Sequence, residues 1–439
     1  MKKVAIISLG CAKNLVDSEV MAGYLNNNGY TFVNNAEKAD IIIVNTCGFI
    51  QPARKESIDA LNKSVLLKKE GKARKVLAVG CYVQRYKEFL KEKFPEVDVW
   101  LGVNAFDSIV QAVEGKSFDS HKNTFLYDHT SLRIISTPPV WAYVKISEGC
   151  SHFCSFCAIP LIKGAYQSRS ISSVVKEARQ LCDRGIREIN LVSQDTTYFG
   201  RDKGKKEALS FLLKELLKIK ELEWIRILYG YPEEITDFLL EIMQEEKICS
   251  YLDIPFQHAD PRIIKNMKRG LNGNQALKLI EKIRRKLPSV ALRTSIVVGF
   301  PGEGRKEFDF LKRFVEEARF DHLGVFTYSR EEGTESYSLG NPVKEDIKKK
   351  RKEEIMEIQA DISKMNNQKY LERKIDVLIE GNCKSNPRFL IGRARFQAPE
   401  VDGVVLIDQR KKEAYIGNPM QKVEIIDINS YDLYGRFPK

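Results

Sequence analysis

The sequence of 439 residues predicts an α/β protein built from three domains, and three observations lead to this prediction. Short β-branched apolar runs alternate with helical stretches over the first 115 residues, which is typical of a doubly wound parallel sheet. A longer series of the same kind follows and indicates a partial TIM-type (β/α)6 barrel. The last stretch changes to short strands broken by Asn, Gly and Pro, the pattern of a small antiparallel β-barrel.

The N-terminal doubly wound domain is expected at residues 1–118. Its predicted strands are Val4–Leu9, Ile41–Val44, Val76–Val79 and Val97–Gly102. Helices are expected between them at Asp17–Asn26, which opens with an Asp-Ser-Glu start signal, and at Gln51–Lys69, which has Pro in its first turn. Residues 116–140 are expected to form a linker with an edge strand.

The central domain is expected at residues 136–366, with six strands that are each followed by helical sequence. The predicted strands are Ala142–Ile146, Glu188–Val192, Trp224–Leu228, Tyr251–Pro255, Leu292–Gly299 and Leu323–Tyr328. The clearest helices are Ser172–Arg184, Ala208–Lys220 and Gln275–Lys286. A charged helix at Asp346–Lys364 closes the domain, and its charges are expected to form a solvated face. The C-terminal β-barrel is expected at residues 367–437, with strands at Lys374–Glu380, Phe389–Ala394, Val401–Leu406 and Lys422–Ile428.

Composition and charge exclude several classes of protein. Hydrophobic residues make up 43% and charged residues 30% of the chain, so a folded core is expected. The longest uncharged apolar runs fall far short of the ~20 residues that cross a bilayer, and the run after Lys2 and Lys3 is too short for a secretion signal. These features predict a soluble, cytoplasmic protein with no membrane partner. The net charge of +12 is spread along the chain, so contact with RNA is permitted but not required.

Nine cysteines are too sparse for a disulfide scaffold, and three of them follow the first three predicted strands directly. Cys11, Cys47 and Cys81 are 36 and 34 residues apart, close to one βα unit of ~30 residues. Because the carboxyl ends of parallel strands meet at one edge of a sheet, the three thiols are expected to meet there. Buried structural cysteines are the alternative, but three in register, two of them after Gly, favour a metal or cluster site.

The strongest signal is a Cys-x3-Cys-x2-Cys run made by Cys150, Cys154 and Cys157, after the first strand of the central domain. One loop with this spacing places three thiolates on three irons of a four-iron, four-sulfur cluster and leaves the fourth iron open for a small molecule. A zinc site with His152 as the fourth ligand is the alternative. Structural zinc usually takes paired arms of ligands, and no second arm is nearby.

A Cys-x3-Cys-x2-Cys run at the mouth of a βα barrel resembles the radical S-adenosylmethionine (SAM) superfamily. In that superfamily the open iron chelates SAM, whose reductive cleavage gives a 5′-deoxyadenosyl radical. With the N-terminal cysteines and the C-terminal β-barrel, the whole chain resembles the methylthiotransferases, whose C-terminal TRAM domain grips the substrate macromolecule. The resemblance implies two 4Fe-4S clusters, one of which binds SAM. Their implied ligands are the two cysteine triads, Cys11, Cys47 and Cys81, and Cys150, Cys154 and Cys157.

Local sequence resembles the branch of methylthiotransferases that modifies a ribosomal protein. The stretch Ser8–Glu19 matches that branch, whereas the branch that modifies tRNA adenosines usually has Gln-Met-Asn after the same cysteine. Further matches are Gln194–Tyr198, Tyr251–His258 and Tyr431–Gly435. Ala12 and Gly304 depart from the branch, which usually has Pro and Thr there. Neither departure removes a ligand.

The implied reaction is β-methylthiolation of an aspartate in protein twelve of the small ribosomal subunit, free or within the ribosome. One SAM would supply the methyl group and another the radical. An aspartate β-carbon has no acidic proton at neutral pH, so no protein acid/base pair is expected, and no catalytic side chain is predicted. A reductant and a sulfur donor are further expected partners. The hypotheses kept open are a tRNA adenosine methylthiotransferase and a non-catalytic, zinc-dependent RNA-binding protein.

Other residues are weighed by their place in the predicted barrel. Ser193 and Gln194 end its second strand, where this superfamily usually holds the SAM amino group, so they are predicted to bind the cofactor. Gln257 ends another strand at the barrel mouth and is predicted to contact SAM or substrate, with an ordinary polar contact as the alternative. The remaining cysteines, Cys182, Cys249 and Cys383, are expected to be structural.

Overall fold

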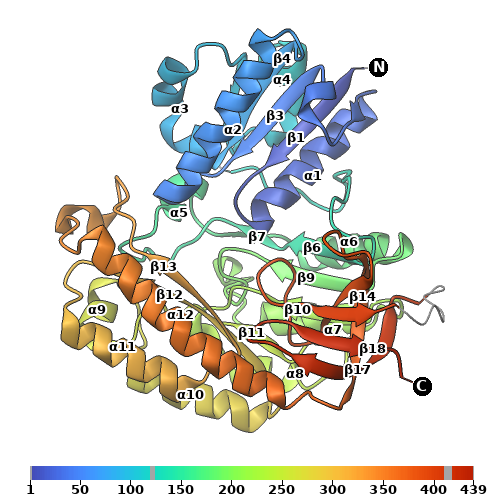
Figure 1. Ribbon diagram of the computed structural model, residues 1–439. Helices are drawn as coiled ribbons and strands as arrows, with labels where there is room; N and C mark the ends of the chain where they lie inside the picture. The colour runs from blue at the N-terminus through green and yellow to red at the C-terminus, as the bar shows by residue number, and fades with distance from the viewer. Residues whose placement is uncertain (1, 119–123, 410–417, 439) are drawn as a thin grey trace.

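The first unit of the chain is a parallel sheet with helices on both faces. The computed structural model describes residues 2–118, 124–409 and 418–438. The strand order is β2 (Thr31–Phe32), β1 (Lys3–Ser8), β3 (Ile41–Thr46), β4 (Lys75–Gly80) and β5 (Val99–Leu101), and all neighbours are parallel. The β-branched run of β3 is buried throughout, because helices cover both faces of the sheet. The predicted doubly wound fold is confirmed (Figure 1).

Four helices cover this sheet. Helices α1 (Ala12–Asn27) and α4 (Ile109–Glu114) pack on one face, and α2 (Gln51–Lys69) and α3 (Cys81–Lys93) pack on the other. Helix α2 has the predicted bounds, whereas α1 begins at Ala12, before the predicted start at Asp17. The Asp-Ser-Glu stretch is therefore not a start signal. These three residues lie within α1, and their buried side chains contact other elements of the fold.

The central unit is an open barrel made of two three-stranded parallel sheets. One has the order β10 (Trp224–Ile227), β9 (Glu188–Val192), β6 (Trp141–Lys145), and the other β11 (Tyr251–Asp253), β12 (Ala291–Val298), β13 (His322–Thr327). The surrounding helices are α6 (Ile171–Asp183), α7 (Ala208–Leu217), α8 (Asp237–Ile242), α9 (Pro261–Asn266), α10 (Gly273–Lys286) and α11 (Arg305–Ala318). Their apolar faces pack on the outer faces of the strands in one large core. The predicted partial barrel is confirmed.

The predicted edge strand is not found in the described part of the link between the first two units, and residues 119–123 of the link lie outside the described residues. Side-chain contacts hold this segment instead. The buried guanidinium of Arg133 pairs with Glu19 of α1 and with Glu177 of α6. The Tyr127 hydroxyl donates a hydrogen bond to Glu177 at 3.0 Å. The linker is therefore fixed by ion pairs, which leave no alternating apolar pattern in the sequence.

The third unit is a closed five-stranded barrel reached through helix α12 (Glu345–Gln368). Its strands are β14 (Lys374–Asn382), β15 (Phe389–Ala394), β16 (Val405–Asp408), β17 (Met420–Ile428) and β18 (Leu433–Arg436). All pairs are antiparallel except β16 and β18, which run parallel. Strand β16 begins later than the predicted strand at Val401–Leu406, because the chain turns at Glu400, which has a φ of 67°. Strand β18 was not predicted.

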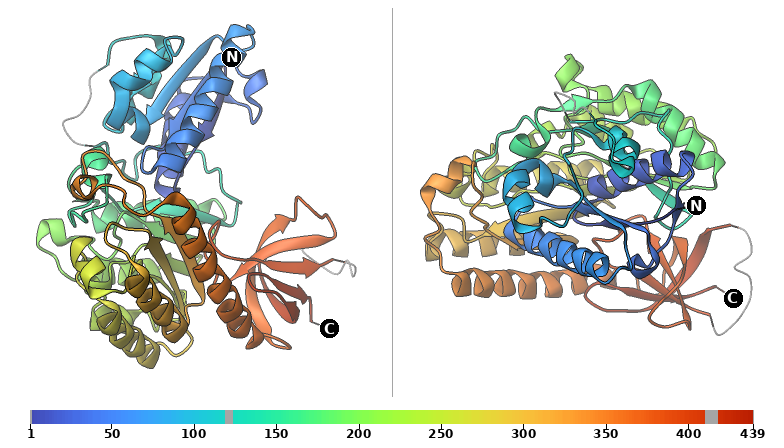
Figure 2. Two further views of the ribbon diagram at one scale, coloured as in Figure 1. Left: turned by 60° about the vertical axis from the view of Figure 1, so that its left-hand side comes forward. Right: turned by 90° about the horizontal axis from the view of Figure 1, so that it is seen from above.

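The open side of the central barrel is covered by the other two units. Val16 and Val20 of α1 pack with Trp141 and Tyr143 on the inner face of β6. From the C-terminal barrel, Arg393 enters the same interior. The N-terminal unit lies above the central barrel in Figure 1, and Figure 2 shows the same stacking from two further sides. Among the described residues no helix is long and apolar enough to span a membrane.

Candidate active site

The first cysteine triad forms at the carboxyl edge of the N-terminal sheet, as predicted from its position after three strands. Cys11 precedes α1, Cys47 follows β3, and Cys81 is the first residue of α3 after β4. Cys47 and Cys81 lie close together, because a Cβ at Gly48 would lie 3.1 Å from the Cys81 carbonyl oxygen, and the Cys81 sulfur lies 3.9 Å from the side-chain oxygen of Asn14 in α1. Gly10 has a φ of +90°, and a Cβ there would lie 2.8 Å from the Cβ of Cys47. The chain therefore passes close to Cys47 only because residue 10 has no side chain.

Burial differs sharply among these three thiols. Cys11 is exposed, Cys47 is half-buried and Cys81 is buried. Burial, followed by the nearby Cys11, raises the pKa of the Cys47 thiol to about 11. Burial also raises the pKa of Cys81, although Lys163 opposes this effect. The two less exposed thiols, Cys47 and Cys81, are called the inner thiols here. Both are therefore neutral near pH 7 until a metal replaces their protons.

The second triad lies in the loop after β7 (Ser147–Glu148), which pairs with β8 (Gln167–Ser168). Gly149 starts the loop with a φ of +76°, and a Cβ there would meet the Ala165 carbonyl oxygen at 2.1 Å. Within this loop the Cys157 amide donates a hydrogen bond to the Cys154 carbonyl oxygen at 3.0 Å, which holds these two residues together. Burial raises the pKa of Cys150 to about 11. The structure thus brings together each of the two triads found in the sequence.

Three aromatic or basic side chains lie beside the second triad: His152, Tyr231 and Arg269. His152 hydrogen-bonds to Asp195 through its Nε2 atom, and its ring stacks on Tyr231 at 3.6 Å between centroids. The guanidinium of Arg269 lies 3.7 Å from the Cys154 sulfur and over the same Tyr231 ring. His152 is therefore engaged away from the thiols. In the described part of the chain no three His, Cys, Asp or Glu side chains are placed to hold a single metal ion.

The donor set fits a four-iron cluster better than a single ion. In such a cluster each thiolate binds a different iron, so three cysteines stand apart around a shared centre. A zinc ion instead needs four ligands within about 2.3 Å. Each triad offers three thiols and no fourth cysteine. A four-iron cluster held by either triad would therefore keep one iron without a protein thiolate.

Three residues predicted to contact SAM lie at the carboxyl ends of barrel strands, on the side of the Cys150 loop. Ser193 and Gln194 follow β9, and Ser193 is fully buried beside Tyr166. Gln257 follows β11 and has a φ of 71°, a conformation that is strained for a residue with a side chain. Asn190 lies on the inner face of β9, and its buried amide has no hydrogen-bond partner among the described residues. The barrel interior thus offers unused polar groups to a ligand such as SAM.

Four buried charged side chains connect the surroundings of the two triads, and none of them was predicted as functional. They are Asp17 of α1, Lys145 of β6, Glu148 of β7 and Lys163 of α5 (Ile159–Lys163). Lys163 lies 3.2 Å from both Asp17 and Glu148, and Lys145 pairs with the same two carboxylates. Burial alone would raise the pKa of Glu148, but the two lysines lower it to about 2. The sequence did contain one signal for this buried set: polar residues lie on the same face of α1 as the apolar Val16 and Val20.

Helix α5 brings the two triads together. The helix begins two residues after Cys157. Ala158, directly before the helix, and Ile162, within it, pack with Phe106 in the core of the N-terminal unit. The Lys163 ammonium influences the pKa of both Cys47 and Cys81. One short segment therefore contacts the surroundings of both cysteine triads.

Lys13 is a further buried charge that the sequence analysis missed. Its ammonium lies 3.6 Å from the centroid of the Tyr229 ring, which follows β10. Burial lowers the pKa of Lys13, but Tyr229, Cys11, Glu148 and Asp253 raise it overall. The side chain is therefore a cation that reaches from the N-terminal unit to the mouth of the barrel.

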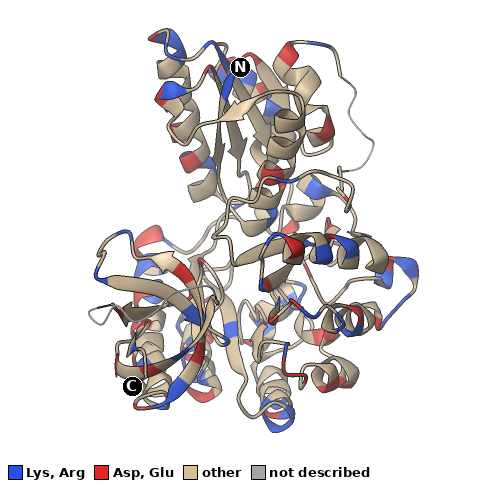
Figure 3. Cartoon of the chain, turned by 90° about the vertical axis from the view of Figure 1, so that its right-hand side faces the viewer, with Lys and Arg blue, Asp and Glu red and all other residues tan. Residues whose placement is uncertain are grey.

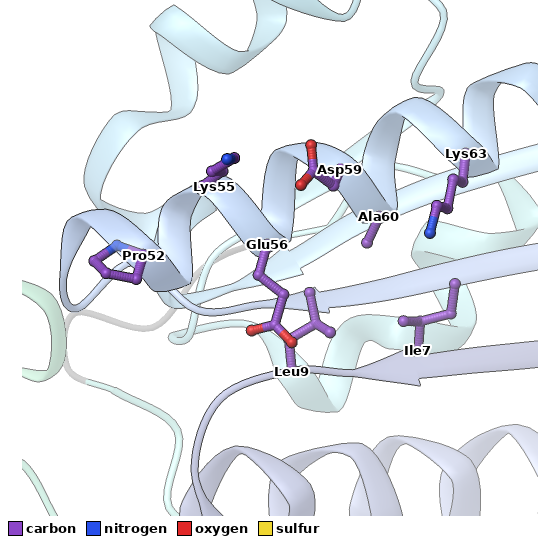
Figure 4. Close-up of a pocket in the computed structure, with 8 residues that line it drawn as sticks. All are labelled: Ile7, Leu9, Pro52, Lys55, Glu56, Asp59, Ala60 and Lys63. Atoms are coloured by element: carbon purple, nitrogen blue, oxygen red, sulfur yellow. The ribbon is translucent and has the colours of Figure 1, made fainter.

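An open pocket of about 540 Å³ lies on the outer side of the first triad. Its apolar floor comes from Ile7 of β1 and from Leu9, which follows β1, and helix α2 forms the opposite wall (Figure 4). The charged residues of that wall are Lys55, Glu56, Asp59 and Lys63. This pocket is separate from the barrel interior.

Three family models match successive parts of the chain. They are the uncharacterized protein family UPF0004 at residues 3–102, the radical SAM superfamily at 144–315, and the TRAM domain at 373–437. A ribosomal protein uS12 methylthiotransferase RimO of Aquifex aeolicus is 44% identical, and the match covers 99% of this chain and 97% of that protein. A RimO of a Thermoanaerobacter species is 43% identical and covers both chains fully. The chain belongs to the RimO family.

RimO membership confirms the predicted enzyme class, a radical SAM methylthiotransferase, and indicates an iron–sulfur cluster and SAM as cofactors. The RimO matches favour the ribosomal-protein branch over the tRNA branch, and the non-catalytic zinc hypothesis does not hold. Among solved structures, the radical SAM methyltransferase TsrM of Kitasatospora setae has a TM-score of 0.55 at 13% identity, covering 74% of this chain and 73% of its own. The radical enzyme OxsB has a TM-score of 0.51 at 13% identity, covering 81% of this chain and 56% of its own. These two share the fold with RimO.

Proposed function

We propose that this enzyme attaches a methylthio group to the β-carbon of an aspartate in ribosomal protein uS12. The observation that carries the proposal is the presence of two cysteine triads at one domain interface, linked by α5 and a buried set of charges. The relatives that match over nearly the whole chain are named for uS12. No observation on this chain favours the tRNA alternative.

Each triad would hold one 4Fe-4S cluster. Cys11, Cys47 and Cys81 would hold the first, and Cys150, Cys154 and Cys157 the second, with SAM on its open iron. Support comes from the matched donor sets, from the burial of the inner thiols and from Gly10 and Gly149, which let the backbone pass close by. When bound, these groups supply a carbon-centred radical, a sulfur atom and a methyl group.

The chain itself positions the reactants and keeps water out. Ser193, Gln194 and Gln257 would hold SAM at the carboxyl ends of the strands, where Asn190 also offers unpaired polar atoms. The interior around them is closed by α1 on one side and by the C-terminal barrel on another. Exclusion of water protects a radical from side reactions. No side chain is assigned as acid or base, because the β C–H bond is not broken by proton transfer.

The C-terminal barrel would help to bind the ribosomal substrate, free or within the ribosome in the cytoplasm. We assign the N-terminal unit to residues 1–118, the radical SAM unit to 136–366 and the TRAM-like unit to 367–437. Lys and Arg are interspersed with Asp and Glu over all three units (Figure 3), so RNA contact would use local patches rather than one basic face. A reductant and a sulfur donor complete the set of partners.

The test compares a strain that lacks this gene with its parent by mass spectrometry. We expect the aspartate peptide of uS12 to lose its methylthio group, while tRNA nucleosides stay unchanged. Complementation with the wild-type gene should restore the modification, and Cys154→Ala should not. Cys182→Ala is the matched control, because Cys182 is buried in α6 away from both triads. Loss of a methylthio group from a tRNA adenosine, with uS12 unchanged, would contradict the proposal.

A further inference from the structure

We propose that Lys13 binds the side-chain carboxylate of the substrate aspartate and so places its β-carbon between the two cysteine triads. The inference rests on the proposed function and extends it, because it assigns substrate recognition to a residue of the N-terminal unit. Four features of the structure support it. The Lys13 ammonium has no hydrogen-bond partner among the described residues, the nearby carboxylates already pair with other residues, the Tyr229 ring is held firmly against the ammonium, and the ammonium reaches from the first triad to the barrel edge that carries the second.

The Lys13 ammonium has no partner of its own. The side chain is only 6% exposed, yet its Nζ atom makes no hydrogen bond or ion pair with any residue that the structure describes. Its Nζ atom lies 3.6 Å from the centroid of the Tyr229 ring, against the face of that ring. The described residues give this ammonium no hydrogen-bond acceptor, and a bound anion would supply one. The ring leaves the N–H groups on the other side of the nitrogen free for such an anion.

The carboxylates nearest to Lys13 are already engaged. Glu148 accepts ion pairs from Lys145 and Lys163, at 2.7 and 3.2 Å. Asp253 pairs with the guanidinium of Arg293 at 3.2 Å. Neither is therefore free to serve as the counter-ion of Lys13.

Tyr229 is held rigidly under the ammonium. Its φ is 61°, in the left-handed region that residues with side chains rarely occupy. Its carbonyl oxygen accepts a hydrogen bond from the Thr196 amide at 2.9 Å, and its own amide donates to Asp253 at 3.4 Å. A strained backbone of this kind persists only where surrounding contacts hold the residue in place. Here those contacts fix the ring that lies against Lys13.

The position of Lys13 suits an aspartate that must react at its β-carbon. Lys13 lies two residues after Cys11 of the first triad, and its ammonium reaches the strand end at Tyr229, on the barrel edge that carries the second triad. In aspartate the β-carbon is bonded directly to the carboxyl carbon. An ion pair to the carboxylate therefore fixes the reacting atom as well as the side chain.

The experiment is a binding cycle with purified, cluster-loaded enzyme and fluorescently labelled uS12. Wild-type and Lys13→Met enzyme are each titrated with native uS12 and with uS12 whose target aspartate is replaced by asparagine. We expect each single change to raise Kd by about 10- to 100-fold, the size of a lost hydrogen-bonded charge contact. The double change should add little, because both remove the same contact. Lys63→Met, an exposed lysine of α2, is the matched control and should bind as the wild type does.

Activity measurements provide a second readout. We expect Lys13→Met to raise KM for uS12 while iron content and 5′-deoxyadenosine formation without substrate stay unchanged, and Lys13→Arg to recover part of the binding. If the fold increases in Kd from the two single changes multiply in the double change, the proposal is wrong. Normal uS12 binding by Lys13→Met with a loss of iron or of methanethiol released on acid quench would also overturn it, since Lys13 would then serve the first cluster. If wild-type enzyme binds uS12 but does not methylthiolate it, the proposed function fails, while the binding cycle still decides the role of Lys13.

Discussion

Gly10 occupies a point in the first triad where no larger residue fits. Its φ is +90°, and an added Cβ would lie 2.8 Å from the Cβ and 2.9 Å from the sulfur of Cys47. Gly10→Ala should therefore displace Cys47 and prevent a cluster from forming on the first triad. We expect the reconstituted protein to contain about four fewer iron atoms per chain, measured together with acid-labile sulfide.

Gly29→Ala is the control for backbone strain alone. Gly29 has a φ of +80°, and a Cβ there meets nothing within 4 Å. We expect this variant to keep all its iron and to lose only about 1 kcal/mol of stability. Equal iron contents in Gly10→Ala and wild-type protein would show that the cluster does not require the close approach of residue 10 to Cys47.

The sequence predicts the six clustered cysteines but not the charges around them. Cysteine spacing is a local property, and the position of each strand end places the thiols at the edge of a sheet. Asp17 and Lys145, in contrast, are separated by 128 residues and meet only in the folded molecule. Lys13 is recognised only through the lack of a partner, which a linear pattern does not reveal. Buried ion pairs between distant segments therefore need coordinates.

At the level of elements, strand prediction succeeds where a strand is covered on both sides. The run at β3 is apolar throughout and stands out clearly, as do the strands of the central barrel. Strand β18 was missed because its four residues, Leu-Tyr-Gly-Arg, alternate too briefly to be recognised. The start of α1 was placed too late because Asp17 and its neighbours resemble a capping sequence while serving as buried contacts.

Strand β9 anchors the C-terminal barrel through Glu188. This carboxylate is buried and pairs with Arg226 of β10 and Arg393 of β15. Burial alone would raise the pKa of Glu188, but the two arginines lower it below its usual value. A lowered pKa stabilises the folded protein above the unfolded pKa of about 4.3, and this contribution is lost as the pH falls through the folded value.

Glu188→Gln should therefore destabilise the protein by about 3 to 5 kcal/mol at pH 7, because it leaves two arginines without their shared counter-ion. The difference from wild type should stay constant from pH 7 to 5 and shrink below about pH 4. Urea unfolding at several pH values measures it. Glu424→Gln is the control, because Glu424 pairs with Arg436 near the surface and should cost less than about 1 kcal/mol. A difference that persists unchanged to pH 3 would contradict the assignment.

At the scale of the whole molecule, Glu331 joins the N-terminal unit to the central barrel. Its carboxylate is 1% exposed and contacts Arg54 of α2 and Arg85 of α3. Glu331→Gln should loosen the alignment of the two triads without removing a thiol. We expect unchanged iron content but several-fold more 5′-deoxyadenosine released per methylthiolated uS12, measured by chromatography and mass spectrometry.

Glu335→Gln is the matched control, since Glu335 lies four residues after Glu331 but pairs with Lys268 at the surface. It should leave the ratio of the two products unchanged. An unchanged ratio in Glu331→Gln would show that this contact does not align the triads.

The relative placement of the three units could not be predicted from the sequence. Each unit has its own periodic pattern, which is why the fold class could be read from the chain. Their contacts include buried charged side chains such as Arg85, Arg133 and Arg393, each paired with a carboxylate far away along the chain. A charged residue in isolation is usually a surface residue, so nothing marks these three in advance.

The packing of α5 into the N-terminal core has a consequence for how the protein is made. A chain emerging from the ribosome completes the N-terminal sheet before Ala158 and Ile162 are synthesised. Until then, part of one apolar face has nothing to cover it. A fragment that stops at residue 118 should therefore associate or aggregate rather than remain a monomer. Truncated translation products would then lack a finished core and would be open to proteolysis before any metal is inserted.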